Sequence, residues 1–171
     1  APQGDLVPET GALLAYVARY VQAFGTTALA GLRIGVYEHS SVARDVLADA
    51  LAQMGAEVVP LARADHFIPV DTEAVDAGTR EMLKRWCDAH ALDALVSTDG
   101  DADRPMVVDA RGTLVPGDVL GPLVAQALGA ERICTPVSSN TLVDHLGFAL
   151  VIRTKIGSPY VIAAMEEAQS K

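Results

Sequence analysis

The chain has 171 residues, half of them hydrophobic, which suits one ordinary domain or one domain and part of another. Its formal net charge of −9 argues against nucleic acid or an anionic membrane surface as a partner. No apolar run approaches the length of a bilayer-spanning helix.

The opening stretch and the cysteines both favour a cytoplasmic protein. Residues 1–5 lack the basic and apolar regions of a signal peptide. Cys87 falls in a helical pattern and Cys134 in an apolar strand pattern, which is typical of reduced thiols in a core.

Helical and strand-like patterns alternate along the first hundred residues. The helical spacing of apolar residues predicts helices over residues 13–24, 42–54 and 75–86. Short apolar runs predict strands over residues 32–37, 58–61 and 94–98, and Pro60 places the second strand at a sheet edge or a strand end. This alternation predicts a three-layer α/β/α domain with a mixed, mostly parallel sheet.

The pattern changes after Arg104. Two short apolar runs, 106–108 and 113–115, flank the polar turn 109–112, so a β-hairpin is expected to add antiparallel strands to the sheet. We therefore expect a first domain over residues 1–115.

Residues 116–171 predict a second, incomplete α/β unit. A helix over residues 119–128 is followed by a strand near 133–135, a short helix, a strand over 149–152 and a last helix from Ser158. The order strand, serine pair, helix, glycine, strand repeats an order already seen in the first domain. Because two strands alone are seldom stable, this unit must pack on the first domain or on another molecule, and self-association through it is one possibility.

Three aspartates directly follow the strand predicted over residues 94–98. In extended backbone, side chains two apart point the same way, so Asp99, Asp101 and Asp103 can converge. Carboxylates held together repel one another unless a cation lies between them. All-oxygen ligation favours a hard ion, and Mg²⁺ held by carboxylates commonly completes its shell with a phosphate. The pattern thus predicts a magnesium site serving a phosphorylated substrate.

Two plainer interpretations of this loop are a solvated turn and an EF-hand. A solvated Asp-Gly turn between two strands stays open on spacing alone. An EF-hand is excluded, because that loop needs Gly at its sixth position and Glu at its twelfth, where Arg104 and Ala110 stand. Ser40 and Ser41, between a strand and a helix, are interpreted as N-cap residues of that helix; the alternative is a phosphate bound by the same backbone N–H groups and assisted by His39.

The sequence Asp99-Gly-Asp-Ala-Asp-Arg104 after a β-strand resembles the metal-binding loop of the α-D-phosphohexomutase superfamily, the phosphomannomutases and phosphoglucomutases. Two further segments are similar to the same superfamily, residues 37–45 (YEHSSVARD) and 153–157 (RTKIG). The resemblance covers nearly the whole chain and implies the superfamily's second domain and the start of its third.

The resemblance also implies functional residues. It makes Asp99, Asp101 and Asp103 the magnesium ligands, and Lys155 with Gly157 contacts of a hexose phosphate, either mannose or glucose phosphate. Arg104 has two interpretations, a counter-ion of the aspartates or a planar fork for phosphate.

The superfamily's phosphoserine loop, Thr-Ala-Ser-His-Asn-Pro, is absent from this sequence. By the resemblance, the full enzyme passes a phosphoryl group from phosphoserine to a hexose phosphate and takes back the other phosphate of the bisphosphate. The chain then contains no catalytic nucleophile, and we expect it to be inactive alone as a mutase.

Two rival functions remain at this point. In a haloacid-dehalogenase-type phosphatase, Asp99 would be the nucleophile and Asp101 the acid/base. In a non-catalytic metal-binding or assembly module, the unfinished second sheet would pair with a copy of itself.

Overall fold

A computed structural model describes residue 9 and residues 11–169. The signal-peptide expectation for residues 1–5 lies outside the described residues. The chain divides into two compact units, residues 1–114 and 115–171, called here the first and the second unit. The fold is α/β, as predicted. The elements of the first unit are α1 (Ala12–Phe24), β1 (Arg33–His39), α2 (Arg44–Gln53), β2 (Glu57–Arg63), α3 (Ala77–His90), β3 (Ala94–Thr98) and β4 (Pro105–Asp109). The short strand β5 (Leu114–Val115) includes the last residue of the first unit and the first residue of the second, and it belongs to the sheet of the first unit.

The first unit contains a mixed five-stranded sheet in the order β2-β1-β3-β4-β5. β1 lies parallel to both β2 and β3, whereas β3 and β4 are antiparallel. Both the predicted mixed sheet and the predicted hairpin are therefore confirmed. β2 is an edge strand, as Pro60 indicated, because a residue without a backbone N–H is tolerated where one side of the strand is unpaired.

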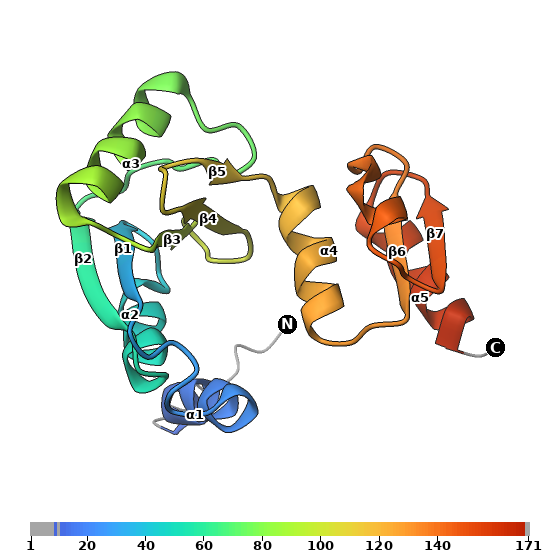
Figure 1. The fold of residues 1–171 in the computed structure, drawn as a ribbon, viewed down its shortest axis with the longest axis horizontal. Coiled ribbons are helices and arrows are strands. Elements are labelled where there is room, and N and C mark those ends of the chain that lie inside the picture. The colour runs from blue at the N-terminus through green and yellow to red at the C-terminus, as the bar shows by residue number, and fades with distance from the viewer. Residues whose placement is uncertain (1–8, 10, 170–171) are drawn as a thin grey trace, which may run out of the picture. The chain divides into compact units, whose positions relative to one another are not determined.

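Helices cover both faces of this sheet (Figure 1). On one face, Tyr37, Leu95 and Val108 form a buried core with Leu83 and Cys87 of α3. On the other face α2 packs against β1 and β2, and α1 packs against α2. Successive residues of a strand point to opposite faces, so β1 supplies side chains to both cores.

Helix α3 begins two residues later than the apolar periodicity predicts. The side chain of Asp76 accepts a hydrogen bond from the Thr79 backbone N–H at 3.0 Å and caps the helix there. Val75 is buried in the core, but it precedes the helix. The apolar side chain was correctly placed in the core, and the cap determines where the helix starts.

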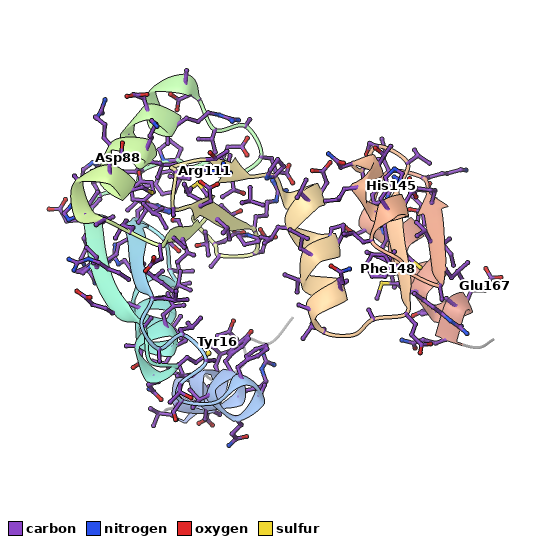
Figure 2. The ribbon with its side chains drawn as sticks, viewed as in Figure 1. Tyr16, Asp88, Arg111, His145, Phe148 and Glu167 are labelled. Atoms are coloured by element: carbon purple, nitrogen blue, oxygen red, sulfur yellow. The ribbon has the colours of Figure 1, made fainter. Side chains whose placement is uncertain are left out.

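The turn between β4 and β5 is organised by the Asp109 side chain. Its Oδ1 atom accepts hydrogen bonds from the backbone N–H groups of Arg111, at 2.9 Å, and Thr113, at 2.8 Å. Gly112 has a φ of +75°, a conformation that favours glycine. Figure 2 labels Arg111 at this turn and Asp88 on α3.

The second unit is a parallel strand pair with helices. Its elements are α4 (Gly117–Ala127), β6 (Arg132–Pro136), a 3₁₀ helix η1 (Thr141–His145), β7 (Leu150–Thr154) and α5 (Ser158–Gln169). β6 and β7 pair in parallel, and no third strand joins them among residues 115–169. Asn140 caps η1 through its side chain. The pair β6–β7 thus repeats the parallel arrangement of β1 and β2. Within residues 11–169, no helix is both long and apolar enough to span a bilayer.

Candidate metal centre

The acidic loop, residues 99–104, begins directly after β3. One carboxylate oxygen from each of Asp99, Asp101 and Asp103 lies within 4.8 Å of the other two. The expected reason for this convergence was wrong, since the loop is not extended. β3 ends at Thr98, and Ala102 turns the chain with a φ of +66°. The bend, rather than a strand's alternation, brings the three side chains together.

Two hydrogen bonds between Asp99 and Arg104 close the base of this loop. The Asp99 N–H donates to the Arg104 carbonyl at 3.1 Å. In return the Arg104 N–H donates to Asp99 Oδ1 at 3.2 Å. The loop therefore starts and ends at one fixed point, and its acidic side chains are attached to an ordered turn.

The charges of the three aspartates are only partly compensated. The negative charge of Asp101 raises the pKa of Asp103, and the hydrogen bond that joins Asp103 to Asp99 adds to this. Burial by itself would raise the pKa of Asp99, but hydrogen bonds from the Arg104 and Asp103 backbone and from the Asp103 carboxyl outweigh it and lower that pKa. The pKa of Asp103 is thus raised while the pKa of Asp99 is lowered, as expected when like charges share a site. A bound cation would relieve this repulsion.

Arg104 lies beside the cluster without neutralising it. Its Nε atom is 3.8 Å from Asp103 Oδ1, at the outer limit of an ion pair, and one terminal nitrogen is 3.4 Å from Glu73. The guanidinium is about half exposed. Its remaining N–H groups can therefore reach a phosphate, and both interpretations of this arginine stay possible.

An open groove runs from the acidic loop to the segment that follows β2. Its lining includes Ser40, Val42, Phe67, Asp99 and Asp101. Phe67 and Val42 are exposed apolar side chains within it. Phe67 was missed because 63–71 reads only as a loop; a phenylalanine inside a loop was the available signal. Val42 was assigned to the helix predicted over 42–54, but it precedes α2 and is exposed.

Neither Ser40 nor Ser41 occupies the N-cap position of α2, although Ser41 Oγ accepts a hydrogen bond from the Ala43 backbone N–H at 3.1 Å, just before the helix begins. α2 begins at Arg44, and its N-cap position is Ala43, which provides no capping side chain. Ser40 Oγ instead accepts from the Ile68 N–H at 2.8 Å and lies 3.1 Å from the Ile68 carbonyl. Ser41 is buried and contacts the end of β3. Both hydroxyls make tertiary contacts that spacing along the chain does not reveal.

Lys155 and Gly157 lie in the second unit, where β7 leads into α5. Gly157 has a φ of +125°, so the tight entry to the helix requires glycine. The exposed Lys155 has its Nζ 5.5 Å from the ring centroid of Tyr160. This is a cation–π contact, which leaves the ammonium's hydrogens available to another ligand.

Residues 14–112 match the family model described as phosphoglucomutase/phosphomannomutase, alpha/beta/alpha domain II. This chain belongs to the phosphoglucomutase/phosphomannomutase family. The match includes the acidic loop, so the family relation and the aspartate cluster concern the same part of the chain.

Curated relatives agree with this membership of the phosphoglucomutase/phosphomannomutase family. A phosphomannomutase of Sinorhizobium fredii is 49% identical over 156 residues, which is 91% of this chain and 33% of the relative. A phosphomannomutase of Salmonella muenchen is 47% identical over 150 residues, 87% of this chain and 31% of the relative. The chain thus spans about a third of the length of these relatives.

A solved structure confirms the fold. A phosphoglucomutase/phosphomannomutase family protein from Burkholderia thailandensis superposes with a TM-score of 0.70 at 20% identity, covering 91% of this chain and 35% of that one.

Proposed function

We propose that this chain is the metal-binding part of a magnesium-dependent phosphohexomutase that interconverts hexose 1- and 6-phosphates. The observation that carries the proposal is the convergence of three carboxylates within 4.8 Å at the end of β3, in a family of phosphomannomutases and phosphoglucomutases. Residues 1–115 would be the family's second domain and residues 116–171 the start of its third.

The donor set fits a magnesium ion. Asp99, Asp101 and Asp103 offer oxygen ligands only, and a carboxylate cluster with a raised pKa at one member gains from a divalent cation. When bound, Mg²⁺ polarises phosphoryl oxygens and offsets negative charge. The residues of the chain would position the ion and the substrate: the aspartates would hold the ion, and Arg104 would orient a phosphate beside them.

Lys155 and Gly157 would contact the hexose phosphate. The lysine side chain is exposed and contacts the Tyr160 ring, and within residues 11–169 it forms no ion pair with a carboxylate. A phosphate would therefore compete with water for it, and not with an existing ion pair. The tight turn at Gly157 allows a ligand to approach the backbone at the helix entry.

Metal titration tests this proposal directly. Mg²⁺ or Mn²⁺ is titrated by calorimetry into the native chain, Asp101→Asn and the charge-matched control Asp88→Asn, whose carboxylate lies on α3 outside the cluster. We expect Asp101→Asn to weaken binding at least tenfold, by analogy with the loss caused by altering groups around a metal. Asp88→Asn should bind as the native chain does. Equal heats from native protein and Asp101→Asn would remove the metal site.

The chain alone should show no mutase turnover, because it provides the aspartates but no phosphoserine. The test is incubation with glucose or mannose 1-phosphate and Mg²⁺, followed by detection of the 6-phosphate. Metal-dependent formation of the 6-phosphate would contradict this expectation.

Self-association through the second unit is a second candidate property. The strand pair β6–β7 has no further strand beside it among residues 115–169, and Leu150, Ile162 and Met165 are exposed apolar side chains of this unit. Sedimentation over a range of concentrations tests it, and a constant mass would reject it. The phosphatase alternative is set aside, since the family match covers the loop on which it rested.

A further inference from the structure

The segment from His39 to Ala43 contacts the acidic loop through a directional chain of hydrogen bonds. The Thr98 hydroxyl is 2.8 Å from the Asp99 carbonyl and 2.6 Å from the Ser41 hydroxyl. The Ala43 N–H donates to Ser41 Oγ at 3.1 Å. A hydroxyl has one proton, and a carbonyl can only accept. Thr98 therefore donates to the Asp99 carbonyl and Ser41 donates to Thr98, so the chain runs from Ala43 through two hydroxyls to the first aspartate.

The carbonyls of Thr98 and Gly100, on either side of the Asp99 carbonyl, also accept hydrogen bonds from residues 39–43. His39 Nε2 lies 2.9 Å from the Thr98 carbonyl, so this nitrogen is the donor, because a carbonyl can only accept. The His39 ring is fully buried against Tyr37, with ring centroids 4.9 Å apart, and this packing fixes its direction. The Val42 N–H donates to the Gly100 carbonyl at 3.1 Å.

The carbonyl oxygens of residues 98, 99 and 100 thus each accept a hydrogen bond. His39 and Val42 donate to the first and the third, and the second accepts from the Thr98 hydroxyl, which Ser41 orients. Fixing consecutive carbonyls fixes the peptide planes between them, and hence the direction of the Asp99 side chain. Ser40, although adjacent in sequence, bonds to Ile68 instead and takes no part in this chain.

We infer that Ser41 is a positioning residue of the acidic loop: acting through Thr98, it sets the loop's backbone so that its carboxylates are arranged for a divalent cation before the cation arrives. The affinity part of this inference rests on the proposed metal-binding function. The ordering of the loop does not. Groups that orient metal ligands without touching the metal commonly change metal affinity by about 10- to 100-fold when they are removed.

The experiment is a double-mutant cycle on the full chain with Mn²⁺ as the probe. Ser41→Ala and Thr98→Val each remove one hydroxyl, Thr98→Ser keeps the hydroxyl, and Ser40→Ala is the control for the loss of a nearby hydroxyl outside the chain. We expect Ser41→Ala and Thr98→Val each to weaken Mn²⁺ binding about tenfold. The double variant should be no weaker than either single one, because both break the same path. Thr98→Ser and Ser40→Ala should stay within about twofold of the native chain.

Amide hydrogen exchange of the metal-free chain provides a readout that does not need metal binding. The N–H groups of Asp99 and Arg104 close the loop, and we expect both to exchange faster in Ser41→Ala than in Ser40→Ala. Circular dichroism confirms that each variant is folded. If the native chain binds no Mn²⁺, the metal proposal fails, and the exchange rates still decide whether Ser41 orders the loop. Unchanged exchange together with unchanged or additive affinity losses would overturn the inference.

Discussion

The hairpin that follows the acidic loop rests on helix α3, and Gly112 makes this contact possible. A Cβ atom at Gly112 would lie 2.5 Å from the Cα and 2.8 Å from the Cβ of Lys84. The backbone of a helix cannot rotate away from such a contact, unlike the end of a flexible side chain. Gly112→Ala should therefore push the β4–β5 turn off α3 (Figure 2, in which Arg111 marks the turn).

The size of the effect follows from two costs. The left-handed conformation at φ +75° costs alanine about 1 kcal/mol. Forcing an extra carbon into a filled space costs about 1–3 kcal/mol more. We expect Gly112→Ala to lower the free energy of unfolding of the first unit by about 2–4 kcal/mol.

Gly31→Ala is the matched control. Gly31 has a φ of +83° in the same unit, but nothing lies within 4 Å of its hypothetical Cβ. Only the conformational cost of about 1 kcal/mol applies there. The difference between the two variants therefore isolates the contact with α3.

Urea unfolding followed by tryptophan fluorescence is the assay. Trp86, the one tryptophan in the sequence, is on α3 and packs on the core of the first unit, so it reports on this unit alone. The free energies come from linear extrapolation with comparable slopes for all three proteins. Equal destabilisation by Gly112→Ala and Gly31→Ala would refute the contact between the turn and α3.

Three further predictions concern metal binding at different pH, folding stability at different pH, and thiol reactivity. Mn²⁺ binding should weaken as the pH falls through the raised pKa of Asp103, because the proton and the metal compete for that carboxylate. Calorimetry between pH 7 and pH 4 measures this, and an affinity that does not change with pH would contradict it. In the metal-free chain, folding stability depends on pH in the opposite direction. The folded state binds the Asp103 proton more tightly than the unfolded state does. The contribution of Asp103 to stability is therefore full below the pKa of the unfolded state and is lost as the pH rises through the pKa of the folded state. Asp103→Asn should remove that part of the pH dependence in urea titrations. Burial raises the pKa of the Cys87 thiol, and the nearby Asp88 and Asp109 add to this. Iodoacetamide at pH 8 should therefore label the half-buried Cys134 before Cys87. Mass spectrometry that showed Cys87 labelled first would argue against its buried position.

Local chemistry along the chain was enough to predict most elements of the fold. The apolar periodicity over 13–24 and the apolar run over 94–98 each match an element of the same type. In the strand the pattern reflects burial, whereas in helix α1 Val17 is buried but Leu13, Leu14 and Phe24 are exposed. The edge position of Pro60 and the turn at 109–112 were also predictable, because a missing N–H and a positive φ are properties of single residues. The acidic motif, too, was visible in the sequence, since three aspartates and an arginine stand within six residues.

Only the tertiary structure decided how that motif is held. The sequence places Ser41 and Thr98 57 residues apart, and nothing in their spacing shows that their hydroxyls meet at 2.6 Å. That contact exists because β1 and β3 are adjacent parallel strands, whose carboxyl ends lie at the same edge of the sheet. A local cap was the natural expectation for Ser41, and its Oγ does accept from the nearby Ala43 N–H, but strand pairing adds the contact with Thr98. Residue types thus determine which chemistry the loop can perform, whereas sheet topology determines which distant groups order it.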